Sequence, residues 1–571
     1  MKNGSQMPYV CVIGLDGGTF KIIDYLVAQG RLPNFAMFME RGSRATLKST
    51  VPAVTPAAWS SFSTGTNPGK TGVVDFFRWT PGEQRISIVN ATSVKGRHVW
   101  SVASETGNRV CVFNVPVTYP AMKINGVFIS GMDAPRLDDR AVYPREFTDE
   151  LLARIPDFSF NPEIDPSFIT DNHEDPAGEF ARQLNEYLQM ELRTIEYLLE
   201  REPWNLFVSV VRSTDIFQHQ FMKHAEKVIN GSEPVTADDK RQAEFVFSCY
   251  EDIDAMLGRI QGSLQARDGN LILMSDHGFT SLEKTVSLNK VLEEAGLLTF
   301  RPRNNDRTYN KTLKTRLLRR LSAKNQNRIR RLMDRVRSES WINRHTDRMM
   351  SHIDLEKTRA CVIGKFGCLY VNLKGRQPMG IVDGEDERQA VLKEVESAMQ
   401  ALQDPDDGEN VIVSALRREQ VYHGPQLERL PDMVIQTRDS YHGVFDNHEM
   451  DQDKVILTPD NIDSSNLTMA GTHDSDGILV MYGSSIRNTD IGTAQIADIA
   501  PTIFELMGIE DLKEFDGELI ADALIDEKSA VSKTASSPDV GHDDNDDPEK
   551  DGYSEDDEEE IRKRLENLGY L

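Results

Sequence analysis

The chain has 571 residues, of which 39% are hydrophobic and 27% charged, and its formal net charge is -26. This length exceeds one small domain, and the ordinary globular composition excludes fibrous and wholly disordered proteins. The negative charge argues against nucleic-acid binding, and no apolar run approaches the roughly 20 residues needed to span a bilayer.

The N-terminal sequence and the cysteines predict the cellular compartment. Residues 1–18 lack the apolar stretch and cleavage site of a signal peptide, and their apolar residues predict a first core strand. Several of the five cysteines lie in apolar, strand-like runs and none forms a C-x-x-C pair, which is typical of buried thiols in a reducing compartment. We therefore expect a cytoplasmic protein.

The first predicted unit is a strand over residues 9–15, a turn, and a helix over residues 20–26. Asp16 opens the turn in the sequence Asp16-Gly17-Gly18. Ligands of open α/β sheets gather beyond the carboxyl ends of strands, which is where Asp16 would lie. An Asp at this place is usually a turn residue, so ligation and turn formation are both open for Asp16.

Residues 50–77 contain the candidate nucleophile of the chain. Thr55 and Pro56 open an apolar helical run, with Thr55 as a helix cap and Pro56 at the first helical position. Unpaired N–H groups and a partial positive charge at a helix N-terminus favour an alkoxide and a bound anion. Thr55 is therefore either a simple helix cap or a nucleophile that faces a phosphate.

Further strands are expected at residues 109–115, 126–130 and 206–211, with a helix over residues 179–199. Asp215 and His219 follow the last of these strands and are four residues apart. If a helical turn begins there, both side chains share one face and reach one metal ion. The alternative is a surface Asp–His pair.

Two more candidate groups lie beside predicted core strands. Asp276 and His277 follow the strand at residues 270–274, and Gly278 would let the chain turn so that both act together. His473 lies just before a strand at residues 477–481. The alternatives are a polar turn for Asp276 and His277, and a surface histidine for His473.

The remaining segments differ in composition from this core. Residues 301–350 contain sixteen Lys or Arg and four Asp or Glu, with a helical apolar stripe. We favour an inserted helical pair that packs on the core over a dock for an anionic membrane surface or polyanion. Residues 351–470 predict a small α+β insert. Residues 539–560 hold thirteen acidic residues and predict disorder, with a short docking helix possible at residues 561–571.

Together the candidates suit a pair of divalent cations about 4 Å apart, which activate a nucleophile and stabilise a leaving oxygen at phosphorus. Each ion needs roughly three or four nitrogen or oxygen ligands. Carboxylate and imidazole ligands without thiolate favour Zn²⁺ or Mn²⁺ over Mg²⁺. The two sets are Asp16, Asp276, His277 and the Thr55 oxygen for one ion, and Asp215, His219 and His473 for the other.

Several motifs in this order resemble the alkaline phosphatase superfamily, and more narrowly its type I phosphodiesterase/nucleotide pyrophosphatase branch and the related predicted phosphohydrolase/phosphomutase proteins. They are GLDGG, VPAVTPAAWSSFSTGTNPGKTG, TDIFQH, SDHGF, GTHDSDGILVMYG, ADIAPTIFELMGI and DGELI, and they cover about residues 8–525. The resemblance implies an α/β fold with a doubly wound, mostly parallel sheet flanked by helices and with inserted cap segments.

On this basis the chain divides into a core with insertions. Residues 8–300 would form the first part of the core, with cap insertions at about 78–200. A basic helical insert at 301–350, a small α+β insert at 351–470, the end of the core at 471–525 and an acidic, mostly disordered tail at 526–571 would follow.

The resemblance also implies a metal-dependent hydrolase of phosphate esters, acting on a small phosphorylated substrate. Thr55 would be transiently phosphorylated at the two-metal site formed by the ligand sets above. Nucleotide pyrophosphatases usually have an Asn some way after the nucleophile, whereas residues 56–59 here are Pro-Ala-Ala-Trp. Backbone N–H groups, the metals or a donor such as Asn114 would replace it, which puts nucleotide substrates in doubt.

The sequence bears on three other functions. A sulfatase is rejected, because the C/S-x-P-x-R motif is missing around Thr55. A phosphomutase or phosphotransferase would use the same site with a hydroxyl in place of water as the acceptor. A non-enzymatic interaction factor would use residues 301–350 for peripheral contact with an anionic surface.

Overall fold

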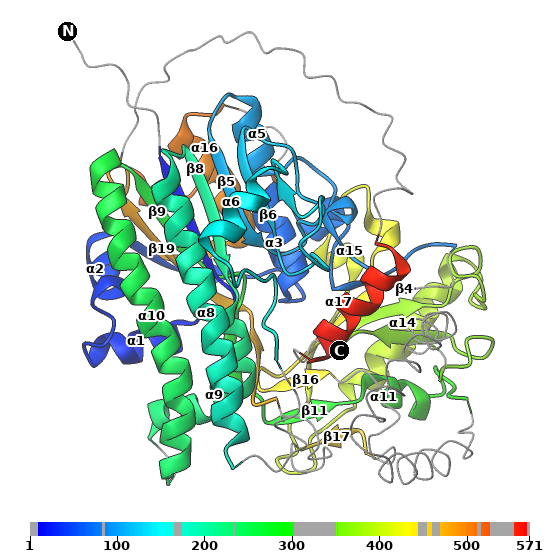
Figure 1. Cartoon of the computed structure of the whole chain (residues 1–571). Coiled ribbons are helices and arrows are strands. Elements are labelled where there is room, and N and C mark those ends of the chain that lie inside the picture. The colour runs from blue at the N-terminus through cyan, green and yellow to red at the C-terminus, as the bar shows by residue number, and fades with distance from the viewer. Residues whose placement is uncertain are drawn as a thin grey trace, which may run out of the picture.

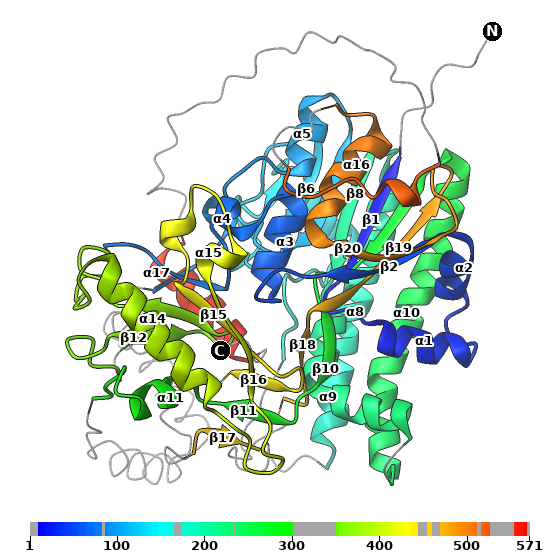
Figure 2. The ribbon, with the colours of Figure 1, turned by 180° about the vertical axis from the view of Figure 1, so that it is seen from behind.

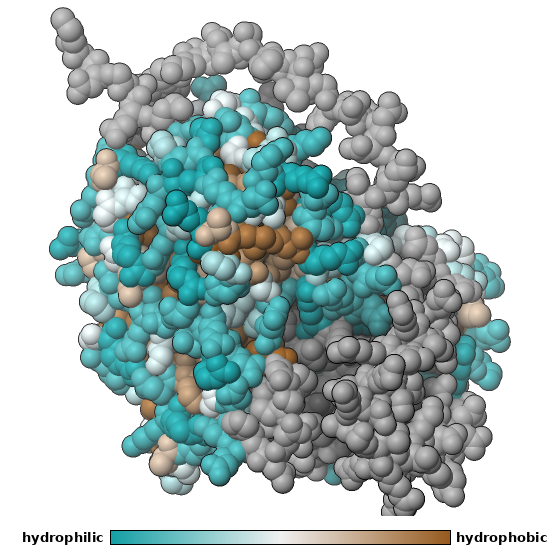
Figure 3. Space-filling model, viewed as in Figure 1, coloured by the Kyte–Doolittle hydropathy of each residue, from teal (hydrophilic) through white to brown (hydrophobic). Residues whose placement is uncertain are grey.

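The computed structural model describes residues 9–82, 86–164, 174–231, 234–301, 350, 352–443, 454–458, 469–510, 515–525 and 553–567. Nearly all of the predicted basic insert at 301–350 lies outside these ranges. Within them, every helix is too short or too polar to cross a bilayer. Figure 3 shows one face of the molecule as largely hydrophilic with small apolar patches, which agrees with the high net charge.

A nine-stranded sheet forms the centre of the molecule (Figure 1). Most neighbouring strands are parallel, and only β19 and β7 run against the others among the described strands of this sheet. In order across the sheet the strands are β20 (Asp490–Gln495), β2 (Ser43–Lys48), β19 (Asp476–Gly483), β9 (Asn270–Met274), β1 (Val10–Leu15), β8 (Leu206–Val211), β5 (Val110–Val115), β6 (Gly126–Ser130) and β7 (Val142–Tyr143).

Helices cover both faces of this sheet. β1 is buried at all six positions because its alternate side chains enter two separate apolar clusters. Cys11 and Ile13 face the cluster that contains α1 (Phe20–Ala28), α2 (Pro33–Arg41), α8 (Pro176–Arg201), α9 (Ser213–Asn230) and α10 (Ala237–Arg267). Val10 and Val12 face α3 (Thr55–Thr64), α5 (Val99–Glu105) and α16 (Ile499–Met507), which come to the front in Figure 2. The predicted doubly wound, mostly parallel sheet is confirmed.

The approach of α3 to the sheet depends on a glycine. A Cβ added at Gly14 in β1 would lie 2.3 Å from Cη2 of Trp59, which is fully buried on α3. Gly14 therefore lets the Trp59 ring rest directly on the strand. This contact sets the position of α3, and with it the position of Thr55 near the ends of the strands.

A second, smaller unit lies beside the core (Figure 2). It is an antiparallel sheet in the order β12 (Ala360–Ile363), β13 (Cys368–Val371), β15 (Met433–Thr437) and β14 (Ile412–Arg417), and α14 (Gly384–Gln400) packs on it. The other strands are β3 (Phe77–Trp79), β4 (Ile86–Ile88), β10 (Gly278–Ser281), β11 (Lys284–Val286), β16 (Tyr441–Gly443), β17 (Ile456–Leu457) and β18 (Gly471–Asp474). The other helices are α4 (Pro68–Thr71), α6 (Phe147–Arg154), α11 (Leu288–Glu294), α15 (Arg418–Val421) and α17 (Glu555–Asn567).

The C-terminal helix α17 begins inside the segment predicted to be disordered. Ile561 and Leu565 are almost fully buried, and the ring of Tyr553 stacks on Tyr119 with centroids 5.8 Å apart. The prediction of disorder is therefore wrong for residues 555–560, although a helix near the C-terminus was expected. Apolar side chains at helical spacing supply a docking face that the acidic composition conceals.

Ion pairs account for the ordering of acidic residues in this helix. Asp557 is fully buried, and its two carboxylate oxygens lie 2.9 Å from Arg136 and 3.5 Å from Arg140. Arg564 donates to the carbonyl of Ala134 at 2.9 Å, in the same loop. Arg136 and Arg140 thus compensate the buried charge of Asp557, and the loop that carries them holds the helix against the core.

Candidate active site

The predicted ligand residues follow the carboxyl ends of neighbouring strands. Asp16 comes directly after β1, Asp276 comes shortly after β9, and Asp215 lies in the first turn of α9, which follows β8. Because β9, β1 and β8 are adjacent and parallel, their carboxyl ends meet at one edge of the sheet. His473 reaches the same edge from β18, which pairs with β10 just after His277.

Hydrogen bonds hold the turn after β1 against both neighbours. The Thr214 hydroxyl donates to the Asp16 carbonyl at 2.6 Å, and the Gly17 N–H donates to Oδ1 of Asp276 at 3.1 Å. Gly17 has a φ of +66°, and an added Cβ would lie 2.7 Å from the ring of Phe279. Only glycine meets both conditions. The two carboxylates are therefore fixed relative to each other by the backbone.

Thr55 is the first residue of α3 and is fully buried. Val54 is the capping residue, and Ala58 donates the first helical hydrogen bond to its carbonyl at 3.0 Å. The prediction of Thr55 as the helix cap is therefore wrong, because the helix begins one residue earlier and the Thr55 hydroxyl caps nothing. Its Oγ1 lies 3.4 Å from Nε2 of His277 instead.

One group of candidate ligands consists of Asp215, His219 and His473. Nε2 of His219 and Nε2 of His473 each lie 3.4 Å from Oδ1 of Asp215. The two Nε2 atoms are 3.2 Å apart. No side chain of the three is more than 3% exposed, so bulk water cannot screen their charges. The predicted helical turn with Asp215 and His219 on one face is present at the start of α9.

The second group lies beside Thr55. Nε2 of His277 is 3.3 Å from Oδ2 of Asp276 and 3.6 Å from Oδ1 of Asp16. Oδ1 and Oδ2 of Asp16, and Oδ2 of Asp276, have no hydrogen-bond donor among the described residues. Ligand atoms of Asp16, Asp215 and His277 also lie within 4.8 Å of one another. Asp215 therefore stands between the two groups and is within reach of both.

Backbone carbonyls determine which ring nitrogen of each histidine faces the site. Nδ1 of His219 lies 3.2 Å from the Gly471 carbonyl, Nδ1 of His277 lies 3.0 Å from the Gly278 carbonyl, and Nδ1 of His473 lies 3.0 Å from the Ala53 carbonyl. A carbonyl only accepts hydrogen bonds, so each Nδ1 carries a proton and each ring turns its Nε2 to the site. The 3.2 Å contact between Nε2 of His219 and Nε2 of His473 requires a proton or a metal ion between the two nitrogens.

Burial and mutual repulsion perturb these groups. Burial, followed by the charges of Asp276 and Asp215, raises the pKa of Asp16 well above its ordinary value. Burial raises the pKa of Asp276 to about 7 and lowers the pKa of His219 to about 4. Burial also lowers the pKa of His277 well below its usual value. The site is thus a dense cluster of carboxyl groups and imidazoles, and its carboxylates are costly to bury without added positive charge.

The donor set therefore fits divalent cations. Asp16 offers two buried oxygens that receive no hydrogen bond from any described residue, and the imidazoles present lone pairs in orientations that carbonyls enforce. Carboxylate and imidazole donors with no cysteine among them suit Zn²⁺ or Mn²⁺.

Two cationic residues near the site were missed by sequence reasoning. Arg212 is fully buried between β8 and α9, and its charge lowers the pKa of Asp16. Lys365 lies in the turn between β12 and β13, where burial lowers its pKa to about 8. The next residue, Phe366, packs on His473 with ring centroids 5.3 Å apart. Arg212 could have been found by its position directly after a core strand, whereas no local pattern marks Lys365.

Asn114 was offered by the sequence as a hydrogen-bond donor to the phosphate, and its contacts exclude this role. Its Nδ2 donates to Oε1 of Glu191 at 2.8 Å and to the Val210 carbonyl at 3.0 Å, so both N–H bonds are used. The suggestion of Asn114 as a phosphate donor is therefore wrong. Glu191 also accepts from the N–H of Arg212 at 3.0 Å, so the role of Asn114 is to position the residues at the end of β8.

Comparisons with known proteins bear on the identity of the chain. A sequence model described as type I phosphodiesterase / nucleotide pyrophosphatase matches residues 10–476, whereas no curated protein sequence matches. Human ectonucleotide pyrophosphatase / phosphodiesterase 5 is a similar solved structure, with 13% identity over 90% of this chain and 99% of that one and a TM-score of 0.46. The murine protein, in an inactive form with AMP, has 13% identity over 91% of this chain and 100% of that one, with a TM-score of 0.47. Phosphonoacetate hydrolase from Sinorhizobium meliloti 1021, in complex with phosphonoformate, has 14% identity over 88% of this chain and 95% of that one, with a TM-score of 0.49.

The family match covers most of the chain and includes every candidate ligand from Asp16 to His473. The resemblance read from the motifs is therefore confirmed at the level of the family. The chain belongs to the type I phosphodiesterase/nucleotide pyrophosphatase family and is a phosphoric ester hydrolase of the alkaline phosphatase superfamily.

Proposed function

We propose that the protein is a metal-dependent hydrolase of phosphate monoesters or diesters, and that Thr55 is its nucleophile. The observation that carries this proposal is the position of Thr55. Its hydroxyl is buried at the N-terminus of α3, 3.4 Å from His277, and it caps no helical N–H group. Such a hydroxyl faces the candidate ligands at the positive end of a helix, where an alkoxide is stabilised.

The two ligand groups would hold two divalent cations, Zn²⁺ or Mn²⁺. Asp16, Asp276, His277 and Thr55 would bind one ion, and a second set would bind the other. Bound cations would lower the pKa of the Thr55 hydroxyl and of water and would neutralise charge on the phosphoryl group. The second set is Asp215, His219 and His473, with Asp215 also within reach of the first ion.

The chain's own residues would carry the reaction in two steps. Oγ1 of Thr55 releases its proton to solvent and attacks phosphorus, and the bond from phosphorus to the leaving oxygen breaks. That oxygen takes up a proton from solvent, which leaves an alcohol and a phosphothreonine. Water then releases a proton and attacks phosphorus from the opposite side, the bond to Oγ1 breaks, and Oγ1 takes up a proton as phosphate, or a phosphate monoester from a diester, leaves. The N-terminus of α3 and the buried cation of Arg212 would stabilise the negative charge.

The test is the replacement of Thr55 in the metal-loaded protein. Thr55→Ala should lower kcat at least about 10³-fold while metal content stays near that of the wild type. Thr55→Ser keeps a hydroxyl and should retain part of the activity. Ser61→Ala is a matched control, since Ser61 is another buried hydroxyl on α3 that lies outside the ligand groups. Full activity in Thr55→Ala would refute the role of Thr55.

Substrate class is tested by a screen of phosphate monoesters, diesters and nucleotides, with Zn²⁺, Mn²⁺ or Mg²⁺ added back after chelation. The proposal expects release of inorganic phosphate or of a phosphate monoester. Transfer of labelled phosphate to a second hydroxyl compound, with no release to water, would instead identify a phosphomutase or phosphotransferase.

A further inference from the structure

A cavity of about 420 Å³ lies at the opposite end of α3 from Thr55. Thr64, the last residue of α3, lines it. At about 1.5 Å per residue, the helix separates Thr55 from Thr64 by roughly 14 Å. The cavity is therefore separate from both groups of candidate metal ligands. Its volume falls in the range of sites for small organic ligands.

Two glycines shape its walls. Gly65 ends α3 with a φ of +65°, and an added Cβ would lie 2.5 Å from Cδ1 of Phe515. This close approach lets the Phe515 ring lie over the end of the helix. Gly96 has a φ of +108° and lies next to Lys95 in the cavity wall. Both backbone conformations disfavour any residue with a side chain, so the geometry of the cavity is built into the backbone.

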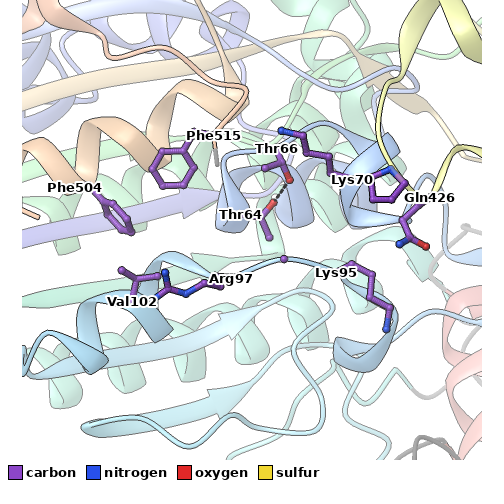
Figure 4. A pocket seen from close by; sticks show the side chains of 11 residues that line it. Thr64, Thr66, Lys70, Lys95, Arg97, Val102, Gln426, Phe504 and Phe515 are labelled. Carbon is purple, nitrogen blue, oxygen red and sulfur yellow. Dashed lines mark hydrogen bonds between the residues drawn. The ribbon is translucent and has the colours of Figure 1, made fainter. Parts of the chain in front are cut away.

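The lining has an aromatic end and a cationic end, and Arg97 lies beside Val102 near the aromatic end (Figure 4). The guanidinium of Arg97 pairs with Glu105. Phe504 and Phe515 lie together at one end, with ring centroids 5.1 Å apart in an edge contact. Lys70 and Lys95 lie toward the other end. The hydroxyls of Thr64 and Thr66 lie between the two ends and are joined by a hydrogen bond of 2.8 Å. An amphipathic ligand would match this lining.

The charges at the cationic end are only partly compensated. Lys70 forms an ion pair with Asp516 at 2.5 Å. Lys95 donates to the carbonyl of Thr92 at 2.9 Å, and its ammonium forms no ion pair with a described carboxylate. Burial and the nearby cations of Arg78 and Arg429 lower the pKa of Lys95. A bound anion would relieve this repulsion between cations.

We propose that this cavity binds a small aromatic anion. Its phosphate, sulfonate or carboxylate group would contact Lys95 and the Thr64 and Thr66 hydroxyls, and its ring would pack against Phe504 and Phe515. This inference does not depend on the proposed reaction at Thr55, because binding here needs neither metal nor turnover.

The test is titration calorimetry of the full chain with naphthalene-2-sulfonate, an aromatic anion with no phosphate ester to hydrolyse. Wild-type protein should bind one equivalent saturably. Lys95→Met should weaken binding about tenfold, the effect of losing one charge-assisted hydrogen bond. Phe515→Leu, which keeps apolar volume, should weaken binding less, and Phe515→Ala more. Lys123→Met is the control, because Lys123 is exposed and does not line the cavity.

The outcomes separate clearly. Saturable binding that is weakened in Lys95→Met and in the Phe515 variants, but not in Lys123→Met, supports the site. No saturable binding at millimolar probe, or equal binding in Lys95→Met and wild type with unchanged thermal midpoints, overturns it. Neutral 2-naphthol should bind more weakly than the sulfonate, and equal affinity would contradict the role of Lys95. Loss of hydrolysis in any variant of Thr55 leaves these results unaffected.

Discussion

Replacing Asp276 with asparagine should stabilise the metal-free protein. Burial raises the pKa of this carboxyl to about 7, compared with an ordinary value of 3.8. The difference of about three pH units, at roughly 1.4 kcal/mol per unit, corresponds to roughly 4 kcal/mol of folding free energy when the group is ionised. Asparagine does not ionise, and its Oδ1 still accepts from Gly17. In the wild type, Oδ2 of Asp276 lies 3.3 Å from Nε2 of His277. The Nδ2 of asparagine would take the place of Oδ2 and donate a hydrogen bond to that Nε2.

The sign of the pH dependence follows from the raised pKa. The folded protein holds the Asp276 proton more tightly than the unfolded chain does. The free energy of unfolding therefore falls as the pH rises from about 4 to about 7, and the full cost is present above pH 7. Wild type and Asp276→Asn should differ little at pH 4 and should differ by up to roughly 4 kcal/mol at pH 8.

The assay is urea denaturation of chelated protein at pH 4, 5.5 and 8, repeated at pH 8 with Zn²⁺ or Mn²⁺. Added metal should stabilise wild type strongly and Asp276→Asn much less, because the variant loses an anionic ligand. Two results would refute the reasoning. One is a variant that is no more stable than wild type without metal at pH 8, and the other is equal stabilisation of both proteins by metal.

Three other substitutions test the framework around the site, each by urea denaturation against wild type. Asp75 is a buried carboxyl whose pKa burial raises to about 7, so Asp75→Asn should reduce the loss of stability between about pH 4 and pH 7, and an unchanged pH profile would contradict this. Glu191→Ala removes a buried acceptor of the Arg212 N–H, and should cost about 3 kcal/mol and lower kcat; unaltered stability would show that the contact is dispensable. Gly14→Ala places a Cβ 2.3 Å from Trp59 and should cost about 1–3 kcal/mol; a neutral effect would mean that α3 shifts freely.

Much of the core could be predicted because its signals are local. β1 is apolar at every position and ends in Asp16 and two glycines, so the strand, the turn and the ligand position are all visible in nine letters. Asp215 and His219 likewise follow a strand at helical spacing. Strand ends in a parallel sheet converge by topology, so candidates at several strand ends are expected to meet.

Other features depend on contacts that no local pattern reveals. The start of α3 at Thr55 instead of Pro56 depends on Val54 adopting the capping conformation. Asn114 looked available, but its amide is used by Glu191, 77 positions later. The approach of Lys365 to the histidines depends on how the second unit packs against the core. In each case a partner distant in sequence decides the role of the residue.

The tail helix shows how composition can mislead. Thirteen acidic residues within residues 539–560 indicate a solvated chain. The signals that matter are the apolar residues Tyr553, Ile561 and Leu565, which pack against the core. The partners of the buried Asp557 are Arg136 and Arg140, which lie more than 400 residues earlier in the chain. Charge compensation between distant segments therefore orders part of an acidic stretch.

The most direct test of the central claim is a crystal structure of the protein grown with Mn²⁺ or Zn²⁺, with anomalous scattering used to locate the ions. We predict two peaks about 4 Å apart, one among Asp215, His219 and His473 and the other beside Asp16, Asp276, His277 and Oγ1 of Thr55. Peaks elsewhere, or none at these side chains at saturating metal, would contradict the account.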